Sequence, residues 1–330
     1  MFVVQGVRRA NLTDRTTIWF EASIDTDANP WRLTISTNLP AIADGAHSEL
    51  GRAAAREVEL VLERRPSERL GAEPFGRVVI PMALTWGAPR EGVAVQTQVL
   101  YGEPLFLLDV TESGDYHLVQ GVDGYTGWVR SDAVERVDRA TFTRLLNGGR
   151  QRVTHHTMVD DFNVPPGAMV DADGSVLTEP GASPALLAQD RLRPPQGARP
   201  GTIAAETALR EFLYTPYVFG GRSTQGVDCS GLVGVAWTAA GLQLPRDANQ
   251  QSLVGILVAT PWYRDALLPG DILFFVDRAG RTIHTGISLG GDLFIHASPP
   301  EVHITSLDPG SEHYSETWDR AFLFARRPME

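Results

Sequence analysis

Two short alternating segments near the C-terminal end constrain the fold of this chain most strongly. Residues 283–289 and 293–297 each alternate apolar residues with small or polar ones, which is the pattern of a β-strand with one buried face. Gly290, Gly291 and Asp292 separate them, and glycine-rich loops of this length are typical of hairpin turns. We therefore expect an antiparallel hairpin here.

The length of the hairpin loop decides which side chains share a face. With a three-residue loop, Leu289 pairs with Leu293, which places His296 opposite Gly286 and one diagonal step from His284. A two-residue loop would put the histidines on opposite faces, because a shift of one residue turns every side chain over. The alternation favours the first register. One face is then apolar (Ile283, Ile287, Leu289, Leu293, Ile295) and the other small and polar (His284, Gly286, Ser288, His296, Ser298).

Helical patterns precede these strands. Apolar residues recur at roughly helical spacing from Ile203 to Leu213, before a break at Pro216, and a second helix is indicated from Ser230 to Ala240. A strand is expected from Asp271 to Val276. These helices and strands indicate a new domain, which we place at residues 201–330.

The first 200 residues divide into three parts. Residues 1–76 combine an alternating run, 17–21, with a charged stretch of helical character, 53–65, and predict a mixed or β-rich module of unknown role. Residues 141–200 are rich in turn formers and are either a linker or a second, degenerate β module. Between them, residues 77–140 contain short β segments that predict a small all-β barrel: Val78–Ile80, Val93–Val95, Pro104–Leu108 and Tyr116–Val119.

The chain contains one cysteine, Cys229, so no disulfide can form within it. Cys229 begins the predicted second helix, where unpaired backbone N–H groups favour a thiolate and lower the pKa of the thiol. We expect Cys229 to act as a nucleophile, with His284 as its base and His296 holding the orientation and tautomer of that imidazole. Backbone N–H groups at the helix start, including that of Cys229, would receive the oxyanion.

Other roles for the same side chains stay open at this point. Two histidines at this spacing also occur as hydrogen-bonded core residues, and a lone cysteine is often a small buried hydrophobe. Cys229, His284 and His296 would also supply three ligands of a zinc site. Nothing else in the sequence indicates a metal, and we expect neither a metal nor a cofactor.

The charge and hydropathy of the chain limit its partners. A formal net charge of −11 without a basic stripe excludes nucleic acid as an expected partner. No run of about 18 consecutive apolar residues occurs, so we expect no membrane partner, and the N-terminus lacks a signal-peptide pattern. The expectation is a cytoplasmic protein, or a secreted or periplasmic one if the chain lacks its native leader.

The sequence around Cys229 resembles the nucleophile motif of the NlpC cysteine peptidases. The resemblance rests on residues 215–221 (Thr-Pro-Tyr-Val-Phe-Gly-Gly) and 226–232 (Gly-Val-Asp-Cys-Ser-Gly-Leu). It extends over residues 201–330 through these shorter matches: Leu244-Pro245-Arg246-Asp247, Gln250, Pro269-Gly270-Asp271, His284-Thr285-Gly286-Ile287 and Phe294-Ile295-His296-Ala297. It implies a papain-like α+β fold for the catalytic domain, with Cys229, His284 and His296 as the triad.

The resemblance also implies a substrate. Members of the family hydrolyse peptidoglycan stem peptides, commonly between γ-D-glutamate and a diamino acid such as meso-diaminopimelate or lysine. Residues 98–103 and 124–129 are similar to bacterial SH3 domains of cell-wall enzymes. Members with both domains look like enzymes that prefer detached peptides with a free N-terminal L-alanine, as in muropeptide recycling, so peptidoglycan-derived peptides are the expected partners.

Five further residues are implied as substrate-binding by the same resemblance. Tyr217, Asp228 and Ser230 match such positions in the catalytic domain, while Glu103 and Tyr125 of the SH3 module would form the wall that closes the cleft. Asp228 would pair with the substrate ammonium. Alternatively, Asp228 simply caps the helix that begins at Cys229.

Two other functions remain possible on the sequence alone. The chain would be a wall-binding module if its peptidase-like domain did no chemistry. The same triad would also support thiol acyl transfer or amide hydrolysis on another substrate, because a fold does not fix a function.

Overall fold

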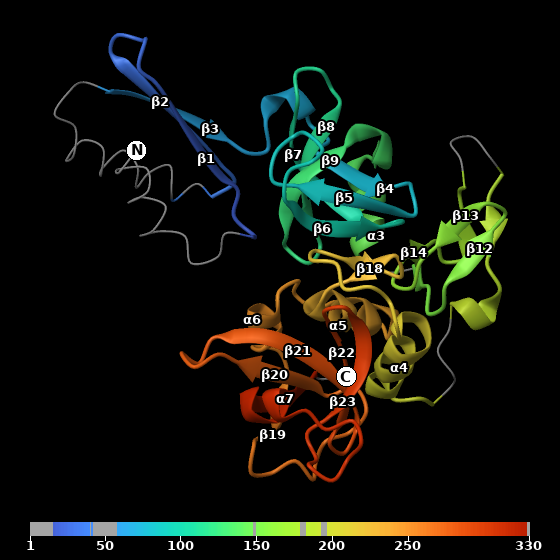
Figure 1. Ribbon diagram of the computed structural model, residues 1–330. Coiled ribbons are helices and arrows are strands. Elements are labelled where there is room, and N and C mark those ends of the chain that lie inside the picture. Colours follow the sequence, from blue (N-terminus) through green and yellow to red (C-terminus); the bar gives the residue numbers. More distant parts are fainter. Residues whose placement is uncertain are drawn as a thin grey trace.

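The computed structural model describes residues 16–39, 41, 58–147, 150–178, 183–192 and 197–328. From the N-terminus, the chain forms a small sheet, a β-barrel, a group of short hairpins and an α+β domain (Figure 1). The barrel lies against the α+β domain, and the hairpins lie beside both.

The N-terminal sheet has the strand order β1-β2-β3, with β1 at Phe20–Asp25, β2 at Trp31–Thr37 and β3 at Val58–Arg64. Strands β2 and β3 are parallel. The helix predicted for residues 53–65 is therefore wrong over β3, and residues 53–57 lie outside the described residues. Alternate side chains of β3 pack on the buried Leu33 and Ile35, so the period of two in this segment outweighs its charged, helix-like composition.

The barrel is a seven-stranded sheet with the order β10-β4-β7-β8-β9-β5-β6. Its strands are β4 (Phe75–Val78), β5 (Met82–Trp86), β6 (Val95–Leu100), β7 (Pro104–Val110), β8 (Tyr116–Gly121), β9 (Thr126–Arg130) and β10 (Val134–Arg136). The strands predicted in β7 and β8 are confirmed, whereas the other two predicted segments only touch strand ends, at Val78 and Val95. Helix α3 (Arg139–Asn147) follows and stacks Phe142 on Phe75, with ring centroids 4.6 Å apart.

Residues 150–192 form three two-stranded sheets around a small buried cluster. The strands are β11 (Gln151–Arg152), β12 (Thr157–Val159), β13 (Phe162–Val164), β14 (Met169–Val170), β15 (Ser175–Val176) and β16 (Ala185–Leu186). Tyr101 of the barrel belongs to this cluster, and its hydroxyl accepts a hydrogen bond of 2.8 Å from the backbone N–H of Leu177. The hairpins thus share a core residue with the barrel.

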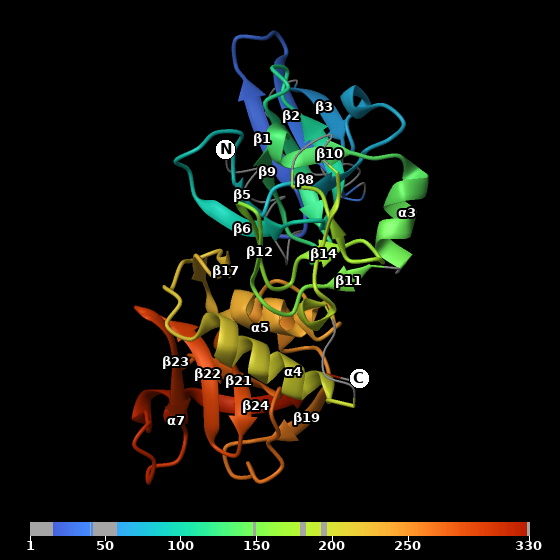
Figure 2. The same ribbon diagram turned by 90° about the vertical axis from the view of Figure 1, so that its right-hand side faces the viewer.

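The α+β domain packs its helices on an antiparallel six-stranded sheet, as the sequence predicted. The sheet order is β19-β24-β20-β21-β22-β23, and α4 and α5 lie side by side on one face (Figure 2). The elements are α4 (Pro200–Thr207), continued as a π-helix at 208–212, β17 (Arg222–Ser223), β18 (Gly226–Val227), α5 (Cys229–Ala239), α6 (Ala248–Gln251), β19 (Ile256–Ala259), β20 (Ile272–Val276), β21 (Thr282–Gly290), β22 (Leu293–Ser298), β23 (Glu301–Ser306), α7 (Glu316–Ala321) and β24 (Phe322–Arg327). Within the described residues, no helix is both long and apolar enough to cross a bilayer.

The hairpin of β21 and β22 has the predicted register near the histidines but a different turn. Ile287 pairs with Ile295. The same register, continued by one residue, places Gly286 opposite His296, as expected. The turn, however, contains only Gly291 and Asp292, and a bulge between Ser288 and Gly290 takes up the extra residue. The bulge keeps His284 and His296 on the same face of the sheet, whereas a two-residue turn without a bulge would place them on opposite faces.

The predicted division of this hairpin into an apolar and a polar face is only partly right. Ile287 and Ile295 are fully buried under α4 and α5, but Ile283 is exposed. The opposite face is covered as well, by an aromatic cluster that includes Phe275 and Phe294. The histidines therefore lie in an apolar environment rather than on a solvated polar face.

Candidate active site

Cys229 is the first residue of α5, and two local features fix the start of this helix. The Asp228 side chain caps it by accepting a 2.7 Å hydrogen bond from the backbone N–H of Gly231. A Cβ at Gly231 would come within 2.0 Å of the carbonyl oxygen of Gly221, so only glycine lets the preceding turn approach the helix this closely. The thiol is left partly exposed at the helix N-terminus.

The pKa of the Cys229 thiol is raised to about 11, mainly by burial and further by the charge of Asp228. The backbone N–H groups of Ser230 and Thr285 act in the opposite direction. The expectation of a stabilised thiolate is therefore wrong for the free site. The apolar surroundings outweigh the helix N-terminus, and the resting group is a neutral thiol.

The two histidines of the predicted triad meet. His284 Nε2 and His296 Nδ1 are 2.7 Å apart, and the side chains are 5% and 0% exposed. Gly286 lies between them in the sheet, where a Cβ would come within 3.1 Å of the Cβ of His296. This glycine gives the second imidazole the space it needs.

Both imidazoles are neutral in the free protein. Burial lowers the pKa of His284 to about 3 and that of His296 to about 2, and the neighbouring His303 lowers both further. A neutral imidazole can accept a proton, so His284 can act as a general base toward a neutral thiol. The backbone N–H of Thr285, the residue after His284, is directed at the sulfur and shows that β21 reaches the start of α5.

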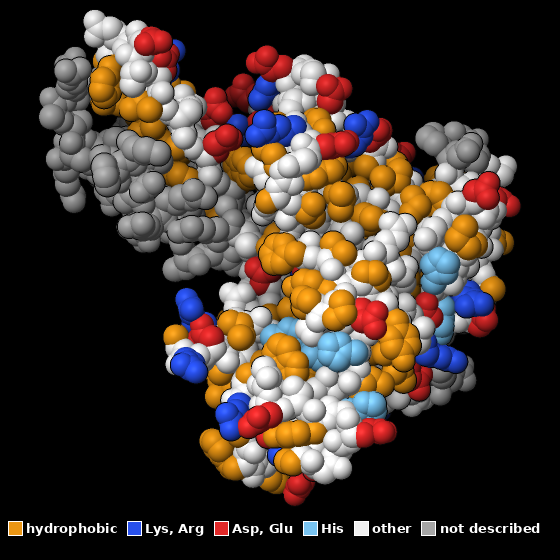
Figure 3. Space-filling view, viewed as in Figure 1, with side chains coloured by type: hydrophobic (Ala, Val, Ile, Leu, Met, Phe, Trp, Pro, Cys, Tyr) orange, Lys and Arg blue, Asp and Glu red, His pale blue; other side chains and the backbone are white. Residues whose placement is uncertain are grey.

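Aromatic rings enclose the histidine pair. Trp318 of α7 stacks on His284 with centroids 4.2 Å apart and an angle of 24°, and it meets His296 edge-on at 5.2 Å. His303 of β23 lies 4.4 Å from His296, ring to ring. Sequence analysis missed Trp318 because neither α7 nor β23 was predicted. Histidine side chains reach the surface over β21 to β23, bordered by hydrophobic side chains (Figure 3).

Asp228 is saturated by contacts within the protein. Arg246 binds its two carboxylate oxygens at 3.0 and 2.7 Å, and the backbone N–H of Gly220 donates to it at 2.8 Å. Ser230 is buried and accepts a 2.9 Å hydrogen bond from Arg246. The capping alternative is thus confirmed. The predicted pairing of Asp228 with a substrate ammonium stays a prediction, and in the free protein this carboxylate is already bound by Arg246.

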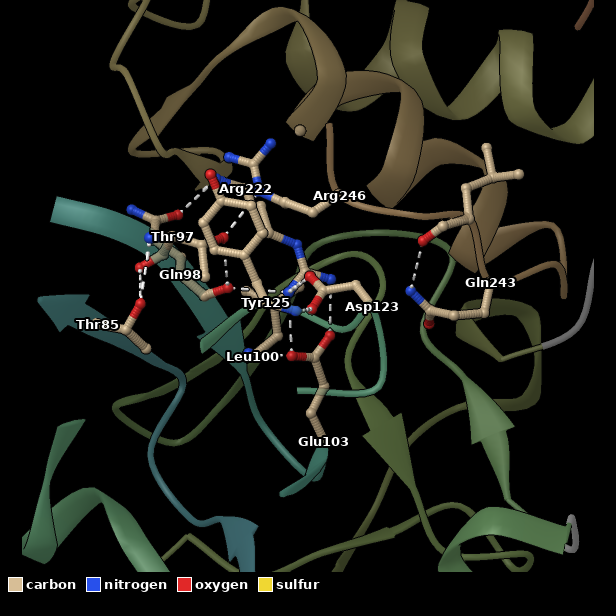
Figure 4. Close-up of polar contacts among 12 residues, drawn as sticks. Thr85, Thr97, Gln98, Leu100, Glu103, Asp123, Tyr125, Arg222, Gln243 and Arg246 are labelled. Atoms are coloured by element: carbon tan, nitrogen blue, oxygen red, sulfur yellow. Dashed lines mark hydrogen bonds and ion pairs between the residues drawn. The ribbon is translucent and has the colours of Figure 1, made fainter. Parts of the chain in front are cut away.

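Glu103 lies inside the contact between the barrel and the catalytic domain (Figure 4). Arg222 donates to its two oxygens at 2.8 and 3.1 Å, and both side chains are almost fully buried. Asp123 lies 3.7 Å from the same guanidinium. Glu103 therefore joins the two domains, and its role in the wall that closes the cleft stays a prediction.

The structure places Tyr125 and Tyr217 at the boundary of the site. Tyr125 is buried with its ring 6.0 Å from the guanidinium carbon of Arg246, and its hydroxyl is hydrogen-bonded to Asp247. The pKa of Tyr217 is raised mainly by burial and further by the nearby Cys229 and Asp228. Asp247 lies at the same boundary, beside Tyr125, although in the sequence it was noted only as part of a motif.

The remaining alternative for these side chains was zinc. Among the residues described, no three His, Cys, Asp or Glu side chains are arranged to hold a metal ion. His284 and His296 instead direct a nitrogen at each other, which is the geometry of a hydrogen-bonded pair and not of two ligands converging on one ion.

Comparison with known proteins agrees with this geometry. Residues 214–327 match the NlpC/P60 family, and residues 87–134 match the bacterial dipeptidyl-peptidase Sh3 domain. Over 141 residues the chain is 37% identical to the probable endopeptidase NlpC of Escherichia coli, covering 41% of this chain and 85% of that protein. The chain belongs to the NlpC/P60 family. It is accordingly a cysteine peptidase.

Two further relatives place the family domain in its context. The γ-D-glutamyl-L-lysine dipeptidyl-peptidase of Bacillus subtilis is 38% identical over 88 residues, which are 26% of this chain and 28% of that enzyme. The crystal structure of an NlpC/P60 family protein from Bacillus cereus aligns with a TM-score of 0.57 at 20% identity, covering 78% of this chain and 100% of that one. The latter shows a shared fold. This chain itself combines a papain-like NlpC/P60 domain with an SH3-like barrel.

Proposed function

We propose that this NlpC/P60 peptidase hydrolyses the bond between a γ-D-glutamyl residue and a diamino acid, meso-diaminopimelate or lysine, in peptidoglycan-derived peptides. We further propose that it prefers peptides with a free N-terminal L-alanine. The pairing of His284 with His296 beside the helix that begins at Cys229 carries the peptidase part. The name of the Bacillus subtilis relative supports the choice of bond.

The reaction starts from the neutral thiol and imidazole. His284 takes the proton of Cys229 as the sulfur attacks the γ-carbonyl carbon, and the oxyanion meets backbone N–H groups at the start of α5. His284 then gives this proton to the amine of the leaving diamino acid, which leaves a thioester. Water, deprotonated by the same imidazole, hydrolyses the thioester and restores the thiol.

Buried charges gather at the contact between the barrel and the catalytic domain. Arg222 engages Glu103, and Arg246 engages Asp228. The Tyr125 hydroxyl and the Asp247 carboxylate are hydrogen-bonded to each other beside Arg246. We assign the substrate ammonium to this pair, because a carboxylate and a phenolic oxygen both accept hydrogen bonds from an ammonium group.

The N-terminal module contributes to the same end of the site. The backbone carbonyl of Thr16 accepts hydrogen bonds from the Thr126 backbone and hydroxyl at 2.8 and 3.0 Å, and the Thr16 hydroxyl lies 3.5 Å from Nε2 of Gln250 in α6. Thr16 therefore lies between Thr126, which follows Tyr125 in the barrel, and helix α6, whose N-cap is Asp247. A wall at this position would exclude peptides extended beyond the N-terminal amine.

Cleavage of a matched pair of peptides tests both parts of the proposal. L-Ala-γ-D-Glu-meso-diaminopimelate and its N-acetylated form are incubated with the protein and with Cys229→Ala, and products are identified by mass spectrometry. We expect the free-amine peptide to be cut and the acetylated one to be cut at least about tenfold more slowly, as expected for one lost charged contact. Equal rates would remove the amine preference, and a Cys229→Ala variant with the parent rate would remove the nucleophile.

The amine site itself is tested by removing one charge. Asp247→Asn keeps a side chain that caps α6 equally well, so the fold is retained while the negative charge is lost. The exposed Asp265, changed to Asn, is the matched control for the change in net charge. We expect Asp247→Asn to raise KM for the free-amine peptide and leave the acetylated one unaffected. The same change in both peptides would place the ammonium elsewhere.

A further inference from the structure

The second nitrogen of His296 has a partner that the mechanism above does not use. His296 Nε2 lies 2.9 Å from the hydroxyl oxygen of Thr305, which is 4% exposed. Thr305 belongs to β23 and pairs with Phe294, while His303 of the same strand pairs with His296. Thr305 is thus the diagonal neighbour of His296 on one face of the sheet, and the contact is set by the strand register.

The contacts form a line of hydrogen bonds in which each proton position fixes the next. His284 directs Nε2 at His296, so Nδ1 is the nitrogen left to receive the thiol proton. Nδ1 is free to accept only if Nε2 carries the proton of the neutral ring. His296 Nδ1 must then accept from it, and His296 Nε2 must carry its own proton and donate it to Thr305.

The opposite arrangement is unproductive. If the Thr305 hydroxyl donated to His296 Nε2, His296 would carry its proton on Nδ1 and donate to His284 Nε2. His284 would then carry its proton on Nδ1, facing the thiol with no lone pair to accept from it. Because His296 is 0% exposed, solvent water does not substitute for the hydroxyl as the acceptor.

We propose that Thr305 is a positioning residue of the peptidase, whose hydroxyl accepts the proton of His296 Nε2 and thereby selects the tautomer in which His284 can act as the base. Thr305 touches neither substrate nor thiol and acts through His296. The proposal deepens the proposed function, because it concerns the same reaction, but the hydrogen-bond line exists without substrate.

His303 is the other polar neighbour of His296, and its contacts show that it does not compete for this role. Its ring meets that of His296 edge to face, and its Nδ1 donates a 2.9 Å hydrogen bond to the carbonyl of Glu301 in its own strand. Asp228, the carboxylate that acts on His284, is paired with Arg246. Among the described residues, Thr305 is therefore the side chain whose hydrogen bond is coupled to the tautomer of the histidine pair.

Three variants separate the hydroxyl from the shape of the side chain. Thr305→Val removes the hydroxyl and keeps a β-branched side chain suited to the strand. Thr305→Ala removes it without adding volume, in case valine is poorly tolerated, and Thr305→Ser restores a hydroxyl in a smaller side chain. Unfolding temperatures show which variants keep the fold.

The first readout is the histidine tautomer, measured by nitrogen NMR on protein labelled at its histidines, without substrate. We expect both rings of the pair to carry the proton on Nε2 in the parent and in Thr305→Ser, and this pattern to be lost in Thr305→Val and Thr305→Ala. A parent in which His296 carries its proton on Nδ1 would overturn the proposal.

The second readout is peptide cleavage. We expect kcat to fall about 10- to 100-fold in Thr305→Val and Thr305→Ala with little change in KM, as for one lost buried hydrogen bond, and to return within about threefold of the parent in Thr305→Ser. Unchanged kcat in the two variants without a hydroxyl would refute the role. If the parent itself fails to cut the peptide, the proposed substrate is wrong, while the NMR result still decides the role of Thr305.

Discussion

Arg246 holds the residue that caps the helix beginning at Cys229, the candidate nucleophile. It binds both oxygens of Asp228, the N-cap of α5, and its Nε donates a 2.8 Å hydrogen bond to Thr97 of the barrel. Arg246→Met keeps much of the volume and removes the charge. Asp228 is then left as a buried carboxylate with no cation against it.

The expected loss follows from this burial. Arg246 and Asp228 are 4% and 5% exposed, and breaking a buried pair by removing one partner costs about 3–5 kcal/mol. That is a large part of the roughly 5–15 kcal/mol by which domains are stable. With about 2–4 °C per kcal/mol for a unit of this size, the unfolding temperature should fall by about 6–20 °C.

A double-mutant cycle measures the pair itself. Asp228→Asn keeps the helix cap and removes the negative charge, so the double variant Arg246→Met with Asp228→Asn has no stranded carboxylate. We expect the double variant to be more stable in urea unfolding than Arg246→Met alone. Arg246→Met should also raise the pKa of Cys229 further, because the guanidinium lowers it, and slow alkylation of the thiol at a fixed pH. An Arg246→Met protein within about 1 kcal/mol of the parent would refute the assignment of this network.

Two further predictions concern the buried histidines. Trp318→Ala opens the stacked face of His284 to water, so the pKa of His284 should rise from about 3 toward the ordinary value, as measured by NMR titration; no rise would mean that Trp318 does not exclude water. The free energy of unfolding should also depend on pH, because folding lowers the pKa values of His284 and His296. The contribution of the two histidines to this free energy is complete above about pH 6.5 and is lost as the pH falls toward 3. Each histidine adds at most about 1.4 kcal/mol per pH unit in this window, and urea unfolding at pH 7 and pH 5 should show a smaller decline in His296→Gln.

The arrangement of the candidate triad could be predicted because its determinants are local. The helix start at Cys229 follows from its cap and turn, and the histidine pair from the alternation of one hairpin. The register near His296 was right although the predicted loop was not. Alternation reports the faces of the strands, and these are fixed by burial, whereas the bulge near Leu289 is an adjustment that alternation does not record.

The environment of the candidate triad could not be predicted, because it depends on contacts between residues far apart in the chain. Glu103 meets Arg222 across 119 residues, and no local pattern shows that such a carboxylate is already paired. Trp318 and Thr305 lie on elements that were not predicted. The thiol pKa was misjudged for the same reason: the helix N-terminus is visible in the sequence, but the apolar surroundings that oppose it are not.

The buried arginines between the barrel and the catalytic domain also restrict how such a protein can change in evolution. Domains joined only by linkers can be exchanged freely, since nothing inside either one depends on its neighbour. Here, replacing the barrel with an unrelated module would leave Arg222 without Glu103 and would take Thr97 away from Arg246. Recombination that exchanged one of these two domains alone would therefore leave buried charged or polar groups without their partners.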